Sequence, residues 1–125
     1  MPRVVDSDLK KPPAPHAWAV STRDNLYSVH VPIRPDGTIE DGDAKEQAEV
    51  TFADIAATLE AAGASFGNVA LVQIFLTSLR HKAAVDEVYL SYFSEPFPVR
   101  ACIAVSELPT PGTVLEIVVI TSLLD

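Results

Sequence analysis

Two charged side chains lie inside segments that are otherwise apolar, and they are the first candidates for a chemical site. Arg100 stands within residues 97–105, and Glu116 stands within residues 114–120. The planar guanidinium fork of Arg100 suits a carboxylate substrate, although an internal ion pair with Glu116 or a salt bridge at an interface would also explain it. Burial raises the pKa of a carboxyl group and a nearby cation lowers it, so Glu116 could hold a water and transfer protons. The alternative for Glu116 is a glutamate that faces solvent at a strand edge.

Cys102 is the single cysteine of the chain and lies two residues after Arg100. Side chains alternate between the two faces of a strand, so Arg100, Cys102 and Ala104 share one face, and Cys102 could line the same cleft. A neighbouring cation would favour the thiolate. The competing interpretation is a small core cysteine, because no histidine is spaced to activate it. One cysteine excludes an internal disulfide and suits a reducing cytoplasm.

The histidines and glycines give no sign of a metal or a nucleotide. His16, His30 and His81 lack the spacing of a metal site, and one cysteine cannot complete a zinc centre, so we expect no metal. His30 ends a predicted strand and could face a cleft, whereas His81 opens a predicted helix. Five scattered glycines do not form a phosphate-binding loop, so we expect no nucleotide cofactor.

Turn signals and apolar periodicity predict the elements that must position these residues. Asp43 and Glu46 form a capping-box pattern that predicts a helix from near Ala44, and Gly63 is expected to end it. The predicted strands are residues 16–20, 26–31, 69–77, 99–106 and 114–121, and the second predicted helix is residues 81–93. The order ββαβαββ predicts an α+β fold, a mixed sheet with two helices on one face. We expect a single domain over residues 1–125, with residues 1–15 as an extended arm that has little regular structure.

The charge and the apolar pattern limit the partners. The chain of 125 residues has 9 Lys and Arg against 17 Asp and Glu, a net charge of −8 that repels phosphate backbones and anionic lipid. We therefore expect no nucleic acid and no membrane among its partners. The first residues lack an apolar signal block, so we expect a cytoplasmic protein. Alternate residues of every predicted strand are apolar, which would leave one face of the sheet exposed in a monomer and predicts a homo-oligomer.

The chain resembles the RidA family, also called the YjgF or reactive intermediate deaminase family, over nearly all of its length. The strongest match is the run Phe97-Pro98-Val99-Arg100-Ala101-Cys102-Ile103-Ala104-Val105, followed by Leu108-Pro109 and by Leu115-Glu116-Ile117. Further matches are Ser28, Pro32, the turn Pro35-Asp36-Gly37, the helix end at residues 59–64, and Tyr89, Tyr92 and Phe93.

The resemblance implies a chorismate-mutase-like fold that assembles as a homotrimer, with the sheets forming an inner barrel and clefts between subunits. It also implies cofactor-independent hydrolysis of enamines and imines, such as 2-aminoacrylate and 2-iminopropanoate, to 2-keto acids and ammonia. Arg100 would bind the substrate carboxylate, and Glu116 would position and activate the water. Cys102 and Phe93 would line the cleft. We expect Arg100 at rest to face mostly solvent and ligand, so that its loss would spare the fold.

Two departures from the family pattern affect this cleft. Pro15-His16 stands where the well-known deaminases have Pro-Tyr, and Ser28-Val29-His30 stands where they have Ser-Gly-Gln. His16, Val29 and His30 are therefore expected to line a pocket of different size and polarity. Two alternatives stay open: a specialised catabolic deaminase of a larger enamine, such as an aminomuconate, and a non-catalytic trimer that binds a metabolite.

Overall fold

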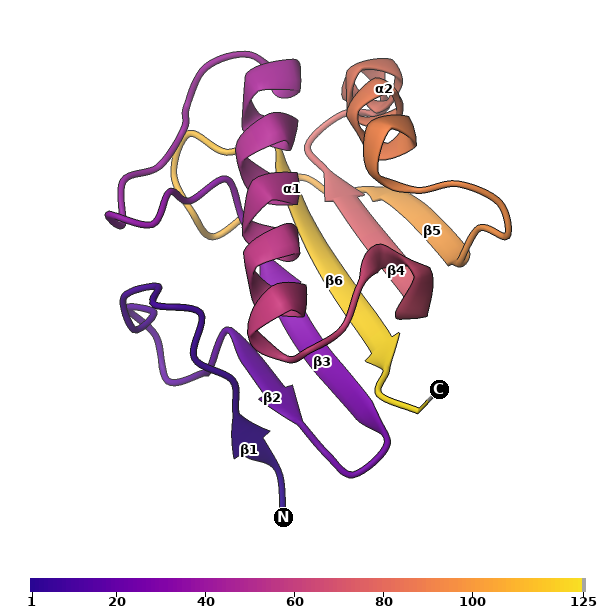
Figure 1. Cartoon of the computed structure of the whole chain (residues 1–125). Coiled ribbons are helices and arrows are strands. Elements are labelled where there is room, and N and C mark those ends of the chain that lie inside the picture. Colours follow the sequence, from indigo (N-terminus) through magenta and orange to yellow (C-terminus); the bar gives the residue numbers. More distant parts are fainter. Residues whose placement is uncertain (125) are drawn as a thin grey trace.

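The computed structural model describes residues 1–124 and contains a 6-stranded mixed sheet with two α-helices on one of its faces (Figure 1). The strands lie in the order β1-β2-β3-β6-β4-β5. β4 and β5 are parallel and are connected through α2, whereas the other neighbouring strands are antiparallel. The strands are β1 Arg3–Val4, β2 Ala19–Ser21, β3 Asn25–His30, β4 Val69–Leu76, β5 Val99–Ala104 and β6 Leu115–Ser122, and the helices are α1 Ala44–Ala61 and α2 Lys82–Tyr92. The predicted α+β fold with a mixed sheet is confirmed.

The first helix begins and ends where the sequence predicts. Asp43 caps α1 by accepting a hydrogen bond of 2.8 Å from the Glu46 N–H. The Glu46 carboxylate in turn accepts a hydrogen bond of 3.1 Å from the Asp43 N–H, which completes the capping box. Gly63 has a φ of +73°, a left-handed conformation that glycine adopts without strain, and it ends the helix.

The core lies between the sheet and the two helices. Alternate residues of β4 and β6 point toward the helices and are buried. The large apolar side chains that the helices bury are Phe52, Ile55 and Leu59 from α1 and Val85, Val88 and Tyr89 from α2. Each large side chain buried in this way contributes roughly 1.5–3 kcal/mol, so this layer is the main source of stability. None of the helices in the described part of the chain is long and apolar enough to cross a bilayer.

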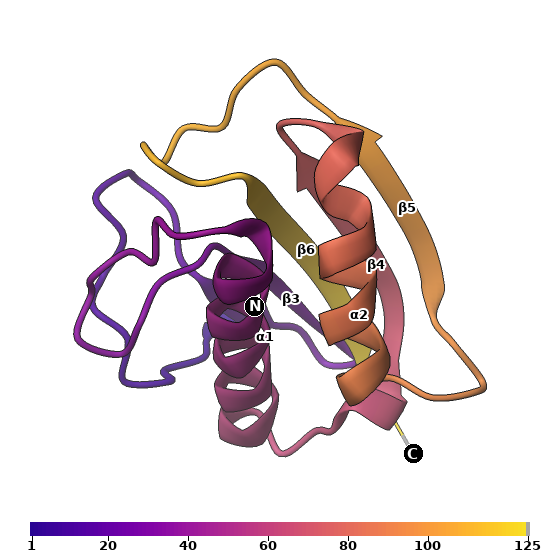
Figure 2. The same ribbon diagram turned by 90° about the horizontal axis from the view of Figure 1, so that it is seen from above.

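The opposite face of the sheet has no helix over it, since α1 and α2 lie on the same side of β4 and β6 (Figure 2). The register of β4 with β5 and β6 places Phe75, Ile103 and Glu116 together on this face. At the edge of the sheet, Val99 and Ile103 are 68% and 47% exposed. Within residues 1–124, nothing covers this apolar edge, and the homo-oligomer that would cover it remains a prediction.

The N-terminal arm is more regular than the sequence predicts. β1 pairs with β2, and the Val5 N–H donates a hydrogen bond of 3.0 Å to the Ala19 carbonyl. β2 begins at Ala19 rather than at residue 16, because the chain bends before it and the His16 N–H donates a hydrogen bond of 2.8 Å to the Ala14 carbonyl instead of to a strand. The Trp18 carbonyl still accepts a hydrogen bond of 2.9 Å from the Val29 N–H of β3, while the Trp18 Nε1–H donates a hydrogen bond of 2.7 Å to the Lys10 carbonyl of the arm.

A buried glutamine joins the start of α1 to the loop that precedes β6. Gln47 Nε2 donates hydrogen bonds to the carbonyls of Gly42 and Gly112, at 2.9 Å and 3.0 Å. Its Oε1 accepts a hydrogen bond of 2.8 Å from the Val114 N–H. Because Gln47 is fully buried, these backbone groups would have no water to replace it.

We predict that Gln47→Leu lowers the free energy of unfolding by about 3 kcal/mol, because it leaves the Val114 N–H and two carbonyls without their partner in the interior. Chemical denaturation measures the change. Glu49→Ala, an exposed position on the same helix, is the matched control and should alter stability by less than about 0.5 kcal/mol. Equal stabilities of Gln47→Leu and the wild-type protein would contradict this account of the loop.

Candidate functional site

Arg100 lies on the edge strand β5 and points to the helix-bearing side of the sheet, because its register partner Val72 is buried there. Its Nη2 is 2.6 Å from Oδ1 of Asp86, and its Cζ is 4.8 Å from the ring centroid of Tyr89. Asp86 and Tyr89 are separated by three positions on α2, so both side chains face Arg100. The guanidinium is therefore held by a carboxylate and by an aromatic face.

This arrangement corrects one expectation about Arg100. Its side chain is 20% exposed and is paired with Asp86, so it does not rest mainly against solvent. The pairing depends on tertiary structure, because the parallel crossover from β4 through α2 to β5 brings Asp86 of α2 over this strand. Arg100 nevertheless borders an open cleft of about 300 Å³, lined by Asp86, Tyr89, Leu90, Phe97, Pro98 and Arg100.

The charges in this cleft alter the titration of its other groups. Burial alone would raise the pKa of Asp86, but hydrogen bonds from Lys82 and Arg100 outweigh burial and hold that pKa below its ordinary value. Burial raises the pKa of the Tyr89 hydroxyl, and Arg100 offsets part of that rise. Asp86 is therefore ionised at neutral pH, and Tyr89 is a neutral hydrogen-bonding group there.

Glu116 points to the face of the sheet without helices, opposite Phe75 of β4. It borders a cleft of about 520 Å³ between the arm, β3 and the loop before β6, lined by Pro13, Ala14, His16, Ala17, Trp18, Val29, Val31, Pro109, Thr110 and Glu116. Burial raises the pKa of Glu116 above its ordinary value of 4.5, and His16 offsets part of the rise. A carboxyl group with a raised pKa beside an open cleft can exchange protons with a bound molecule.

The two central candidates therefore do not meet within one chain. Arg100 is on the helix-bearing face and Glu116 is on the other, and each borders a different cleft. The alternative interpretation, an internal ion pair between Arg100 and Glu116, is not found in residues 1–124, where the ion-pair partner of Arg100 is Asp86. His16, Val29 and Glu116 do come together, as the resemblance implied, and the roles of all these residues remain predictions.

His30 lies in the core and not in a cleft, which corrects the expectation that it borders the substrate. The side chain is 1% exposed beneath α1. Its Nδ1 is 2.7 Å from Oδ2 of Asp54 on α1, and its Nε2 is 2.8 Å from Oγ of Ser28. His30 thus joins β3 to α1 through two polar contacts that are removed from water.

Phe93 is also a core residue, which corrects its expected place beside the substrate. Its ring is stacked on Tyr89 at 4.5 Å and meets the edge of Phe66 at 5.1 Å. Cys102 shares the face of Arg100, as predicted, and is partly buried against the core. The position of Cys102 therefore fits the core interpretation. That Cys102 lines the cleft stays a prediction, supported only by its sharing a strand face with Arg100.

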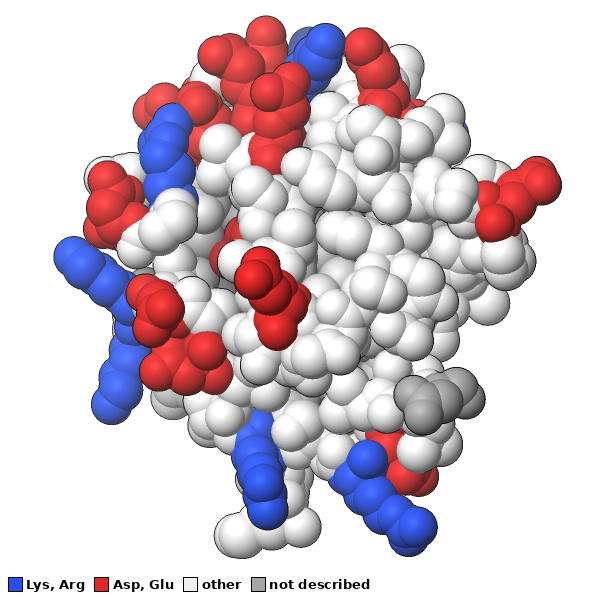
Figure 3. All heavy atoms as spheres, in the orientation of Figure 1, with Lys and Arg blue, Asp and Glu red and all other residues white. Residues whose placement is uncertain are grey.

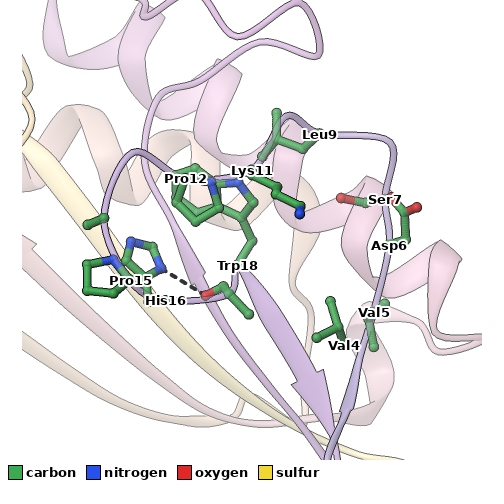
Figure 4. A pocket seen from close by; sticks show the side chains of 12 residues that line it. Val4, Val5, Asp6, Ser7, Leu9, Lys11, Pro12, Pro15, His16 and Trp18 are labelled. Carbon is green, nitrogen blue, oxygen red and sulfur yellow. Dashed lines mark hydrogen bonds between the residues drawn. The ribbon is translucent and has the colours of Figure 1, made fainter.

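A third cleft, of about 450 Å³, lies within the arm itself (Figure 4). It is bordered by β1, by residues 6–12 and by His16 and Trp18, and Lys11 is its cation. The imidazole Nδ1–H of His16 donates a hydrogen bond of 2.9 Å to the Ala17 carbonyl and its ring meets Trp18 edge-on, so His16 separates this cleft from the one that contains Glu116. Residues 14–18, where the arm joins β2, therefore form a wall that the two clefts share.

The sequence interpretation missed Asp86, Tyr89 and Trp18. Asp86 and Tyr89 had one detectable signal, an acid and an aromatic residue on one face of the predicted second helix. Trp18 borders the cleft and anchors the arm through its hydrogen bond to the Lys10 carbonyl. Among residues 1–124, no cluster of three or more His, Cys, Asp or Glu side chains is arranged to hold a metal ion.

Fold and clefts together define a small α+β protein with a candidate anion-binding arginine at a sheet edge. The sequence model of the family described as Endoribonuclease L-PSP matches residues 9–123. The chain therefore belongs to this family, which includes the YjgF, RidA and RutC proteins.

Relatives with different names are similar to this chain in sequence or in fold. A RutC family protein of Pyrococcus abyssi is 39% identical over 101 residues, which cover 79% of this chain and 80% of that one. A 2-iminobutanoate/2-iminopropanoate deaminase of Capra hircus is 34% identical over 116 residues, covering 90% and 85%. The crystal structure of RidA from an Antarctic Psychrobacter is 33% identical with a TM-score of 0.85, covering 94% of this chain and 95% of that one.

We predict that Glu116 makes the protein less stable as the pH rises just above 4.5. Its raised pKa means that the folded state holds this proton more tightly than the unfolded chain does, so stability is lost between the unfolded and the folded pKa and stays constant above both. Unfolding free energies of the wild-type protein and Glu116→Gln, measured from pH 4 to 8 in about half-unit steps, should diverge in that window. If the unfolding free energies of the two proteins change with pH in parallel, burial does not raise the pKa of Glu116.

We predict that His30→Ala lowers the free energy of unfolding by about 3 kcal/mol, because it leaves the Asp54 carboxylate and the Ser28 hydroxyl without their buried partner. Thermal and chemical denaturation measure the loss. The exposed His16→Ala should change stability by less than about 0.5 kcal/mol. If His30→Ala is as stable as the wild-type protein but binds ligand differently, His30 acts in ligand binding and not in the core.

Proposed function

We propose that the protein is a cofactor-independent deaminase that hydrolyses carboxylate-bearing imines and enamines, of the 2-iminopropanoate and 2-aminoacrylate type, to 2-keto acids and ammonia. The observation that carries the proposal is Arg100, a guanidinium fixed beside an open cleft. The deaminase name of a relative 34% identical to this chain supports the same chemistry.

The reaction asks little of the protein beyond orientation and proton transfer. An enamine first takes a proton on its β-carbon and loses one from its nitrogen, which converts it to an imine. Water then adds its oxygen to the imine carbon while the nitrogen gains a proton, and the resulting carbinolamine loses ammonia as the C=O bond forms. Arg100 would hold the carboxylate next to the reacting carbon, and Glu116 would take a proton from the water and return it to the nitrogen.

The opposite placement of Arg100 and Glu116 determines how such a site would be built. If both act on one substrate, Glu116 must come from a second copy of the chain, so the proposal includes a homotrimer with the site between subunits. Val99 and Ile103 of β5 and Phe97 just before this strand are exposed apolar side chains near Arg100 in the chain, and they offer a surface for that contact.

The family description also names an endoribonuclease, and the charge of this chain weighs against RNA. Exposed acidic side chains gather over the N-terminal end of α1, where Asp41, Asp43, Glu46 and Glu49 lie (Figure 3). With a net charge of −8, this surface repels a phosphate backbone.

An amino-acid oxidase that generates 2-imino acids provides the direct test. We expect the wild-type protein to accelerate formation of keto acid and ammonia beyond spontaneous hydrolysis, and Arg100→Ala to lose at least about 100-fold in kcat/KM because the substrate carboxylate loses its charged partner. Arg80→Ala, an exposed arginine on the same protein, is the control. Turnover only with larger enamines would favour the specialised deaminase, and binding of keto acids without turnover would favour the metabolite-binding trimer.

Mixing two inactive variants tests the shared site. Random trimers of Arg100→Ala and Glu116→Gln subunits in equal amounts should regain activity at about one quarter of their sites, where an intact Arg100 meets an intact Glu116 from the neighbour. Neither variant alone should show this gain. No recovery, with mixed trimers present by native mass spectrometry, would place both residues in one subunit's site or remove Glu116 from the reaction.

A further inference from the structure

The structure assigns a positioning role to Asp86: it holds the Arg100 guanidinium in the orientation that receives a substrate carboxylate. This inference rests on the proposed function, since it concerns the same cleft. It adds a residue that the sequence analysis did not single out.

Asp86 is fixed from two sides. Its Oδ1 lies 2.6 Å from Arg100 Nη2, and its Oδ2 accepts a hydrogen bond of 2.7 Å from Lys82 Nζ, one turn earlier on α2. The rotamer of Asp86 is therefore set by two cations, and the direction of the carboxylate determines where the guanidinium can sit.

Tyr89 supplies the third contact. The Arg100 guanidinium lies over its ring at 4.8 Å, and the Tyr89 ring is itself packed edge-on against Phe52 in the core. Asp86 limits rotation of the guanidinium on this face, because a cation above a ring has no directional preference of its own. Without the carboxylate, the long arginine side chain would regain rotamer freedom.

The contact with Asp86 leaves part of the fork unused. It engages Nη2, so the N–H groups on Nε and Nη1 remain for a second acceptor. Asp86 and Arg100 both border the same cleft, which keeps those groups within reach of a bound molecule. A substrate carboxylate can therefore bind Arg100 while Asp86 stays in place.

Asp86 also carries a charge that opposes an anionic substrate, so two variants are needed to separate the charge from the positioning. Asp86→Asn and Asp86→Ala both remove the charge, but only asparagine keeps an oxygen that can occupy the position of Oδ1, 2.6 Å from Arg100 Nη2. Their difference isolates the positioning contact.

We expect KM for the imino acid to be about tenfold higher in Asp86→Ala than in Asp86→Asn, with kcat equal within about threefold, since the carboxylate contact is made in both the ground state and the transition state. Glu87→Ala, next to Asp86 and exposed, is the matched control and should leave KM unchanged. Equal KM values in the two Asp86 variants, or a loss confined to kcat, would overturn the inference. If Asp86→Ala does not fold, Asp86→Ser replaces it, because its hydroxyl is too short to reach Arg100.

Labelling with phenylglyoxal provides a readout that needs no turnover. Arg100 should react at least about fivefold faster in Asp86→Ala than in the wild-type protein, because the ion pair no longer shields the guanidinium. Arg3, Arg23, Arg34 and Arg80, followed in the same digest by mass spectrometry, should react at unchanged rates. An unchanged rate at Arg100 would overturn the inference.

Pyruvate binding distinguishes failure of this inference from failure of the proposed function. If the wild-type protein binds pyruvate but turns over no imine, the deaminase proposal fails, and the ratio of pyruvate Kd values between Asp86→Ala and Asp86→Asn decides the role of Asp86. If turnover is present and that ratio is one, only the inference fails. A wild-type protein that neither binds pyruvate nor turns over imines would overturn both.

Discussion

Each strand of this sheet has to present one set of alternate side chains to α1 and α2 and the other set to a face without helices. This constraint explains why β6 alternates between buried residues and partly exposed ones. It also places Arg100 under the helices and Glu116 away from them, although both lie in strands that are apolar elsewhere. The separation of the two candidates is thus a property of strand geometry, and a chain with this sequence cannot bring them together by local adjustment.

Two side-chain pairs on the helix-bearing side of the sheet join segments that are distant in the sequence. Asp54 of α1 meets His30 of β3, and Asp86 of α2 meets Arg100 of β5. The first pair is closed off from solvent, whereas the second stands beside an open cleft. A carboxylate on a helix thus meets a nitrogen-bearing side chain on a strand in both places; the first pair links β3 to α1, and the second is part of a candidate binding site.

Local signals in the sequence were sufficient for much of the fold. The capping box at Asp43, the stop at Gly63 and the apolar stripe of α1 depend on neighbours within a few residues, and each was predicted correctly. The surroundings of His30 depend on a residue 24 positions away, and those of Arg100 depend on the crossover that carries α2 over β5. A single sequence does not encode such contacts in any local pattern, which is why His30 and Phe93 were assigned to the cleft and Asp86 was overlooked.

The arm has a consequence for how this protein could diversify. Residues 9–18 form a wall of two clefts, yet they contribute no residue to the buried core, and the wall is held to itself by the contact between Trp18 and Lys10. Substitutions there can reshape the chamber beside Glu116 at little cost to stability, since the layer between sheet and helices is untouched. The scaffold thus separates the part that must be preserved for folding from a part in which new ligand preferences can arise by drift.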